Sequence, residues 1–209
     1  MSRNICIISY GTGNLASLGD ALEEVGASCK VAKTPADLEG ADALVLPGVG
    51  HFGHAMNHFR ASGLLVPTLE KIRSGVPTLG ICLGFQLLTR SSEEAAGAAG
   101  LGLLPFSTVR IRPANPRVHK VPHLGWNAIH RSQGSPRLLS GIPAEDQLFY
   151  YANAYAVPWE QGISTALATY SHGSEYVGLI EQDSLFGVQF HPEKSRSQGL
   201  RLLRNFLEV

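Results

Sequence analysis

Short apolar runs alternate with helix-like segments through the first half of the chain. Runs of strand length occupy residues 4–9, 28–32, 43–46 and 76–81. Apolar residues at helical spacing follow three of these runs, at residues 15–25, around Met56, Phe59 and Leu64, and at residues 84–91. This alternation of strands and helices predicts a parallel sheet that is covered by helices on both faces.

The second half has a different pattern, with short strand candidates at close spacing. These candidates lie at residues 109–111, 126–129, 148–156, 166–169, 176–181 and 186–190, and a closing helix is predicted at 200–207. We therefore expect an antiparallel or mixed extension of the same sheet. No internal repeat, low-complexity tract or linker interrupts the sequence, which predicts one α/β domain over residues 1–209.

Composition narrows the range of partners and locations. The 209 residues contain 17 Lys plus Arg and 17 Asp plus Glu, so the net charge is zero and nucleic acid is not expected as a partner. Only 16% of the residues are charged, and we expect such a surface to be partly covered by another protein. No apolar run approaches the ~18 residues of a membrane span, and residues 1–9 lack the features of a signal peptide. The 3 cysteines form no C-x-x-C pair, which favours a reduced, cytoplasmic setting without disulfides or a thiolate zinc site.

The segment Gly80-Ile81-Cys82-Leu83-Gly84 lies where an apolar run meets a helical one. It has the G-x-S-x-G spacing of a nucleophile elbow, with Cys in place of Ser. Such a turn raises the side chain above the sheet, and the N-terminus of the following helix favours the thiolate. The amide of Leu83 is then free to donate to an oxyanion. The alternative is a buried, inert cysteine, which is the favoured interpretation for Cys6 and Cys29 inside strand patterns.

A base for this nucleophile follows the last apolar run, at His191-Pro192-Glu193. Residues two apart in an extended segment point the same way, so His191 and Glu193 can share a face. A cysteine nucleophile needs a base, and the base needs a group that orients it. The sequence thus predicts a triad of Cys82, His191 and Glu193, with a plain surface turn as the alternative for the tripeptide.

Glycines also end the third apolar run, at Pro47-Gly48-Val49-Gly50. They permit close approach of the backbone to a ligand, so an amide of this segment can complete an oxyanion hole with Leu83. Because glycine flanks Val49 on both sides, a peptide plane can rotate here at low steric cost, which suggests a switch. An ordinary tight turn is the alternative.

Three other patterns favour structural roles over chemistry. Residues 11–16 fit the G-x-G-x-x-A dinucleotide fingerprint, but no acidic residue ends the second strand, so we expect a tight turn. His51, His54 and His58 share one helical face without an evident fourth ligand, so no metal is predicted. A basic stretch favours a solvated face or a contact with an acidic rim on a partner: Arg110, Arg112, Arg117, Lys120 and Arg131.

Together these segments resemble the class I, triad-type glutamine amidotransferases. Residues 80–86 (G-I-C-L-G-x-Q) are similar to their nucleophile motif, and residues 189–193 (Q-F-H-P-E) to their base motif. More narrowly, the chain resembles the glutaminase subunits of imidazole glycerol phosphate synthases. That resemblance rests on Y-G-T-G-N at 10–14, P-G-V-G at 47–50, F-G and A-M within 52–56, S-E-E at 92–94, V-P-H-L-G-W-N at 121–127, and H-P-E-K-S at 191–195 followed by G-L.

The resemblance implies a flavodoxin-like fold and hydrolysis of glutamine to glutamate and ammonia through a cysteine thioester, without a cofactor. It implies a heterodimer in which ammonia passes to a TIM-barrel cyclase subunit that makes imidazole glycerol phosphate in histidine biosynthesis. By position, Cys82, His191 and Glu193 take the triad roles. Gly50, Gln86 and Glu94 match positions that line the glutamine pocket, and Val49 and Leu83 match the oxyanion amides. His123 and Trp126 fall in the loop that faces the synthase partner.

One segment departs from the family pattern. Where the family usually has Phe-Val-His-Ser-Tyr, this chain has Tyr-Ala-Asn-Ala-Tyr at residues 151–155. The loss is tolerable if this strand offers mainly backbone groups to glutamine, whereas coupling of the two active sites is altered if the histidine takes part in it. Two other classes stay open on the residues alone. One is a cysteine peptidase or small flavodoxin-like hydrolase, which often has His where this chain has Leu83, and the other is a non-catalytic nucleotide-binding or scaffold module.

Overall fold

A computed structural model of the chain describes residues 2–11, 14–132, 134–159 and 166–209. Within these residues, the largest sheet has eight strands. In spatial order they are β2 (Ser28–Ala32), β1 (Asn4–Ile8), β3 (Ala43–Leu46), β4 (Thr78–Ile81), β13 (Leu185–Val188), β12 (Glu175–Gln182), β11 (Ala166–Ser171) and β8 (His130–Arg131). The pairs from β2 to β13 are parallel, and those from β13 to β8 are antiparallel. The predicted α/β class, with an antiparallel extension, is confirmed.

Helices cover both faces of the sheet because each central strand is apolar on both sides. On β1, Ile5 and Ile7 belong to one buried cluster, which includes residues of α1 (Leu15–Glu24) and α5 (Arg196–Leu207). The alternate residues Cys6 and Ile8 belong to a second cluster. That cluster includes residues of α2 (Phe52–Ala61), α3 (Leu65–Arg73) and α4 (Leu83–Leu88). The period of two along the strand therefore divides the core into two layers.

The prediction of one helix around Met56 and Leu64 is wrong in one respect, since two helices, α2 and α3, occur there. Gly63 has φ +74° and separates them, and Leu64 is the N-cap residue of α3. A left-handed residue cannot continue a right-handed helix, so the chain changes direction at this glycine. The last helix begins at Arg196, earlier than predicted, and α4 ends at Leu88.

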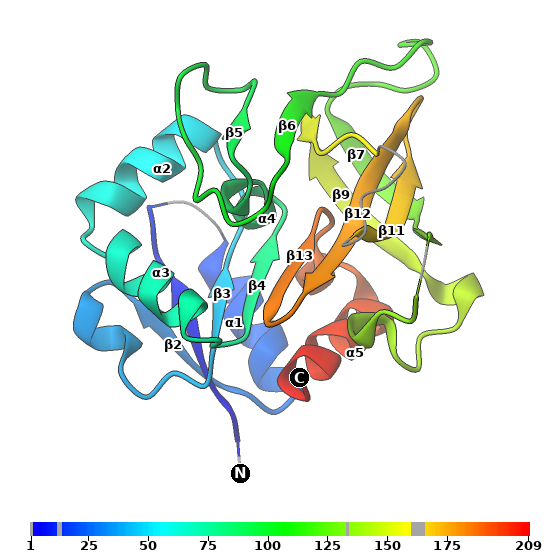
Figure 1. Ribbon diagram of the computed structural model, residues 1–209. Coiled ribbons are helices and arrows are strands. Elements are labelled where there is room, and N and C mark those ends of the chain that lie inside the picture. Colours follow the sequence, from blue (N-terminus) through cyan, green and yellow to red (C-terminus); the bar gives the residue numbers. More distant parts are fainter. Residues whose placement is uncertain (1, 12–13, 133, 160–165) are drawn as a thin grey trace.

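Several strands of the second half do not extend the main sheet, so that part of the prediction is wrong. A small sheet contains β5 (Ser91–Ser92), β6 (Ser107–Arg110) and β10 (Tyr155–Ala156), and a separate ribbon pairs β7 (His123–Ala128) with β9 (Leu148–Asn153). Figure 1 shows β5, β6 and β7 in the upper part of the molecule, beyond the end of β4 that leads into α4. An alternating pattern indicates a strand but does not specify its partner. Residues of β9 and β10 line the site described below.

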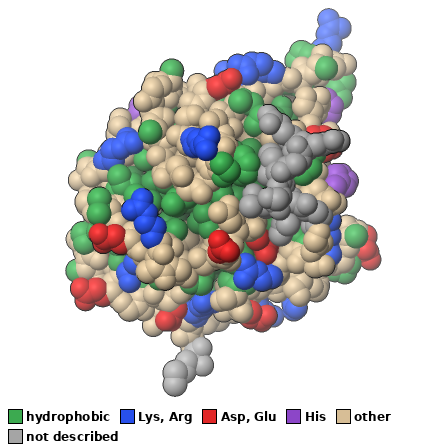
Figure 2. All heavy atoms as spheres, in the orientation of Figure 1, with side chains coloured by type: hydrophobic (Ala, Val, Ile, Leu, Met, Phe, Trp, Pro, Cys, Tyr) green, Lys and Arg blue, Asp and Glu red, His purple; other side chains and the backbone are tan. Residues whose placement is uncertain are grey.

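The remaining described elements are short helical turns. They are η1 (Pro35–Leu38), η2 (Arg137–Leu139), η3 (Ala144–Asp146) and η4 (Pro192–Lys194). The two chain ends lie on the same side of the molecule (Figure 1), and Arg3 donates from Nη1 to the carbonyl oxygens of Leu207 at 2.9 Å and Val209 at 2.6 Å. Positive and negative side chains are interspersed on the face drawn in Figure 2. None of the described helices has the length and apolar character needed to cross a membrane.

Candidate active site

Cys82 lies in a sharp turn between β4 and α4. Its backbone has φ +49° and ψ −105°, in the region that L-residues rarely adopt. The turn closes because its neighbours have no side chains: a Cβ on Gly80 would lie 2.8 Å from Phe85 Cα, and one on Gly84 would overlap the Leu46 carbonyl oxygen. The Cys82 amide donates to the Val188 carbonyl at 2.8 Å, which ties the turn to β13. This geometry is that of a nucleophile elbow.

His191 and Glu193 follow β13, which is the parallel neighbour of β4. Ile81 pairs with Val188, so the residues after both strands emerge at the same end of the sheet. His191 Nδ1 and Glu193 Oε1 lie 2.8 Å apart, and the two side chains are only 1% and 6% exposed. The imidazole N–H at Nδ1 therefore donates to the carboxylate, which leaves Nε2 as the nitrogen that can exchange a proton. The backbone amide of His191 donates to the Tyr150 carbonyl at 2.8 Å.

The environment of His191 favours its charged form. Burial lowers the pKa of the imidazole, but the negative charges of Cys82 and of the Glu193 carboxylate raise that pKa to about 10. His191 Nε2 is buried and has no hydrogen-bond partner among the described residues. Glu193 Oε2 is buried and accepts no hydrogen bond from the described residues. A buried base between a thiol and a carboxylate, with its pKa raised by both, is suited to hold an imidazolium beside a thiolate.

A pocket of about 100 Å³ opens at the cysteine turn. Its lining includes six of the residues singled out from the sequence, namely Val49, Gly50, Cys82, Leu83, Gln86 and Glu94. His191 and Glu193 are buried and do not line it. The structure therefore brings the predicted site residues of separate segments to one end of the sheet, apart from the two predicted partner contacts.

The glycine segment after β3 packs tightly against the turn. A Cβ on Gly48 would overlap the Ile81 carbonyl oxygen and the Leu83 amide nitrogen, and it would lie 2.9 Å from the Gly84 nitrogen. The Leu83 amide is at the first position of α4, where no carbonyl of the helix can accept its hydrogen bond. Tyr10 donates its hydroxyl to the Pro47 carbonyl oxygen and anchors the start of this segment. The arrangement puts the backbone of residues 48–50 against the turn at residues 81–84, on the lining of the pocket.

Two polar side chains of the pocket are fixed by hydrogen bonds. Gln86 donates from Nε2 to the Tyr155 carbonyl at 2.8 Å and to Gln189 Oε1 at 3.2 Å. Glu94 accepts at Oε2 from the Phe52 amide at 2.7 Å, at the start of α2. Because Gln86 uses its amino group in this way, its carbonyl oxygen is left as an acceptor at the pocket.

The segment that departs from the family pattern forms one wall. Ala152, Asn153, Ala154 and Tyr155 line the pocket. Asn153 donates from Nδ2 to the Tyr155 carbonyl at 3.0 Å and to the Tyr170 hydroxyl at 3.1 Å. Its amide nitrogen thus supports the strand, and its buried oxygen has no partner among the described residues.

The two residues expected to face a partner point in opposite directions. They lie in β7 rather than in a loop, and they are three residues apart, so the alternation of the strand places them on different faces. Trp126 is 39% exposed, whereas His123 is buried and stacks on Tyr151 and His172. Burial, followed by the charges of His172 and His119, lowers the pKa of His123 to about 4. A partner can therefore reach Trp126 directly but not His123.

Sequence reasoning missed Gln189, whose side chain is fully buried and donates from Nε2 to Cys82 Sγ at 3.6 Å. The signal was present, because Gln189 belongs to the same Q-F-H-P-E segment as His191, directly after β13. It also missed Tyr10, which lies at the end of β1 in the Y-G-T-G-N segment.

The other sequence patterns have structural roles in the described residues. Asn14 caps α1, since its Oδ1 accepts from the Ser17 amide at 3.4 Å, while residues 12–13 of the fingerprint lie outside the described residues. His51 caps α2 by accepting at Nδ1 from the Gly53 amide at 3.1 Å. The described residues contain no group of three or more His, Cys, Asp or Glu that could hold a metal ion. In the basic stretch, Arg112 pairs with Glu93 at 2.9 Å.

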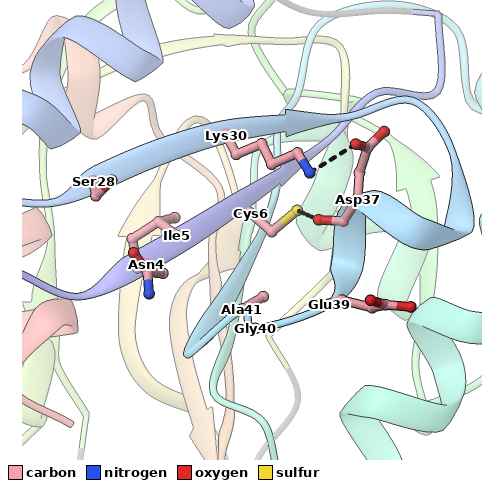
Figure 3. A pocket seen from close by; sticks show the side chains of 9 residues that line it. All are labelled: Asn4, Ile5, Cys6, Ser28, Lys30, Asp37, Glu39, Gly40 and Ala41. Atoms are coloured by element: carbon pink, nitrogen blue, oxygen red, sulfur yellow. Dashed lines mark hydrogen bonds and ion pairs between the residues drawn. The ribbon is translucent and has the colours of Figure 1, made fainter.

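A second pocket, of about 310 Å³, lies beside β1, β2 and η1 (Figure 3). Lys30 pairs there with Asp37 at 2.8 Å, and the Cys6 thiol donates to the Asp37 carbonyl oxygen at 3.4 Å. Burial raises the pKa of the Cys6 thiol. A neutral thiol that donates to a backbone carbonyl is not an activated nucleophile, so Cys6 is not the catalytic cysteine.

Comparison with known proteins agrees with this geometry. The model of the family "Glutamine amidotransferase class-I" matches residues 6–209. The chain belongs to the class-I glutamine amidotransferase family. It is 45% identical to the imidazole glycerol phosphate synthase subunit HisH of Methanothermobacter thermautotrophicus, over 98% of each chain. It is also 42% identical to HisH of Moorella thermoacetica, over 99% of this chain and 95% of that protein. The predicted family and enzyme class, a glutamine amidotransferase of the HisH type with glutaminase activity, are confirmed, and the peptidase and scaffold alternatives fall away.

Solved structures share the fold. PurLQS from Thermotoga maritima has a TM-score of 0.75 at 18% identity, over 100% of this chain and 99% of that one. The glutaminase domain of CTPS from Trypanosoma brucei has a TM-score of 0.64 at 15% identity, over 99% of this chain and 92% of that one. The roles of the individual site residues remain predictions.

Proposed function

We propose that the chain hydrolyses glutamine at Cys82 and supplies the ammonia to a cyclase subunit that makes imidazole glycerol phosphate in histidine biosynthesis. The observation that carries this proposal is the Cys82 elbow with the buried His191–Glu193 pair, in a chain that is 45% identical to a HisH subunit. The protein named imidazole glycerol phosphate synthase hisHF, from Emericella nidulans, supports a cyclase partner. This chain is 40% identical to it but matches only 37% of its length, so most of that synthase corresponds to a part that this chain does not supply.

In the proposed reaction, His191 first donates the proton on Nε2 and later takes one up again. The Cys82 thiolate attacks the side-chain carbonyl carbon of glutamine, and the Leu83 and Val49 amides stabilise the oxyanion. The carbon–nitrogen bond then breaks as His191 gives its Nε2 proton to the departing nitrogen, which leaves a glutamyl thioester and ammonia. Water next loses a proton to Nε2 and attacks the thioester, so the carbon–sulfur bond breaks and glutamate is released. Glu193 keeps the ring in the orientation that both steps require.

Recognition of glutamine falls to the polar groups around the small pocket. The amino-acid end of glutamine carries an ammonium group and a carboxylate. The free oxygen of Gln86 and the carboxylate of Glu94 are acceptors for the ammonium group, and both residues line the pocket with Gly50. The backbone of residues 152–155 supplies a further wall. A volume of about 100 Å³ suits a small side chain better than a peptide.

The outer face of the β7–β9 ribbon is the proposed docking surface for the cyclase. Leu124, Trp126 and Leu148 are large apolar residues that are 65%, 39% and 41% exposed on it. Leu124 pairs with Ala152, which lines the pocket, so the exposed face is continuous with the site where ammonia is released. Arg196 lies 4.9 Å above the Trp126 ring and adds positive charge, which suits a partner with an acidic rim. A cytoplasmic location fits this proposal.

Reconstitution with a cyclase subunit of an imidazole glycerol phosphate synthase tests the proposal. The wild-type pair should form product from glutamine and also from ammonium salt. The Cys82→Ala pair should lose glutamate release and glutamine-dependent synthesis while it keeps synthesis from ammonium salt. Substantial hydrolysis of glutamine by Cys82→Ala would exclude the assigned nucleophile.

A further inference from the structure

Cys82 has a second polar neighbour besides His191. The side chain of Gln189 is completely buried, and its Nε2 donates to Cys82 Sγ at 3.6 Å. The backbone amide of Gln189 donates to the Gly178 carbonyl at 3.0 Å, which anchors this residue to β12. The sulfur atom therefore receives a hydrogen bond from a neutral amide that is held by the sheet.

A backbone carbonyl on another element decides which end of the Gln189 side-chain amide faces Cys82. The Tyr155 carbonyl oxygen can only accept, so the side chain of Gln86 must turn its amino group toward it, at 2.8 Å. The same amino group lies 3.2 Å from Gln189 and needs an acceptor there, which turns Oε1 of Gln189 toward Gln86. The amino group of Gln189 is then left facing Cys82 Sγ. A chain of hydrogen bonds thus runs from β10 to the reacting sulfur.

We propose that Gln189 is a catalytic residue, whose amide N–H stabilises the Cys82 thiolate, and that Gln86 and the Tyr155 carbonyl orient it. This inference rests on the proposed hydrolysis of glutamine at Cys82. The amide complements His191 because it keeps its protons throughout the reaction. When His191 gives its proton to the departing nitrogen of glutamine, the sulfur still has a donor. The same donor stabilises Sγ as the leaving group when water releases glutamate.

The pH dependence of Cys82 modification measures this role without glutamine. Purified protein is treated with methyl methanethiosulfonate at a series of pH values, and peptide mass spectrometry follows the adduct on Cys82. Burial raises the pKa of Cys29 to about 11 and raises that of Cys6, so both react slowly and are resolved as separate peptides. In Gln189→Met, which keeps the size but removes the N–H, the midpoint of the pH–rate profile should rise by about one unit.

Two further variants separate this role from a packing effect. Gln86→Met leaves Gln189 in place but removes its orienting donor, so the midpoint should move in the same direction. Gln147→Met is the matched control, since Gln147 is also a buried glutamine and donates to the Ile142 carbonyl at 3.0 Å, among residues of the η2–η3 segment. It should keep the wild-type midpoint even if its melting temperature falls.

An unshifted midpoint in Gln189→Met, or in Gln86→Met if Gln189→Met does not fold, overturns the proposal. With the cyclase present, Gln189→Met should also lower kcat for glutamine hydrolysis about tenfold at neutral pH and change KM less. The proposed function fails separately, if the wild-type pair releases no glutamate from glutamine. A shifted midpoint in that case would leave the assignment of Gln189 to the thiolate intact.

Discussion

Substitution of Gly48 by alanine should damage catalysis far more than stability. The added methyl group would overlap the Ile81 carbonyl oxygen and the Leu83 amide nitrogen, and it would lie 2.9 Å from the Gly84 nitrogen. All three are backbone atoms that cannot rotate away. The segment that carries Val49 must therefore move outward by about 1.5 Å to reach ordinary contact distance, and a displacement of only about 1 Å in a catalytic group already costs about 10²-fold in rate.

The largest expected loss in kcat is the loss of the proposed oxyanion contact of the Val49 amide. If the shift removes the Val49 amide as a donor, kcat should fall by about 10² to 10³, the usual cost of one oxyanion-hole donor. Glutamate release by the complex with a cyclase subunit gives kcat and KM, and thermal unfolding of the free chain gives the stability. The expected signature is a large loss in kcat with a smaller change in KM.

Gly19→Ala is the matched control for this substitution. Gly19 lies in the middle of α1, and its new Cβ would be 4.0 Å from Ile7 Cδ1, the nearest atom. Alanine is favoured over glycine within a helix by about 0.5–1 kcal/mol, so this variant should be slightly stabilised and fully active. A Gly48→Ala enzyme that keeps kcat within about threefold of wild type would refute the assignment of residues 47–50 to the oxyanion hole.

Three further outcomes are expected. His191→Ala should lower glutamine hydrolysis more than Glu193→Ala, because the first removes the proton carrier and the second only its orientation; rates in the presence of the cyclase check this, and the reverse order would exchange the two roles. The folded pKa of His191 is about 10, above its unfolded value of about 6.5. Its contribution to stability is therefore complete below pH 6.5 and lost as the pH rises toward 10. Urea unfolding of wild type and His191→Gln should show this difference, and parallel curves would contradict it. Trp126→Ala should weaken cyclase binding by about 2 kcal/mol or more if Trp126 is a central contact, while labelling of Cys82 by thiol reagents in the free chain stays unchanged; calorimetric titration measures the affinity, and an unchanged Kd would move the docking surface elsewhere.

Much of the fold follows from local patterns in the first half of the chain. The runs at 28–32 and 43–46 coincide with β2 and β3, because both are short stretches bounded by turn residues; the second is entirely apolar, and the first contains Ser28 and Lys30. The helix after β1 begins at its predicted Asn14 cap and ends just before Gly26, which has φ +102°. Strand partners in the second half were harder to predict, since β6, β7, β9 and β10 differ from β11 and β12 in their neighbours and not in their periodicity.

The site divides in the same way between local and long-range features. Cys82 and the His191–Glu193 pair were predictable because each depends on spacing within a few residues after one strand. The reason given for the pair was wrong in detail, since Pro192–Lys194 form the helical turn η4 and not an extended segment. The contact of Gln189 with Cys82 joins residues 107 positions apart, and the spacing of apolar and polar residues along the chain does not predict it. The burial of His123 was missed for a different reason: its neighbours His172 and Tyr151 come from other parts of the chain, and only their packing decides which face of β7 is covered.

The backbone contacts of the site explain how the departure at residues 151–155 is compatible with the catalytic arrangement. The Tyr150 carbonyl accepts from the amide of His191, and the Tyr155 carbonyl accepts from the side chain of Gln86. Both are main-chain oxygens, so neither contact depends on which side chains occupy the positions between them. Asn153 even adds a donor to the Tyr155 carbonyl, at 3.0 Å. The strand thus holds the base on one side and the Gln86–Gln189 chain on the other through its backbone, and substitutions along it are expected to change the pocket wall before they change the nucleophile.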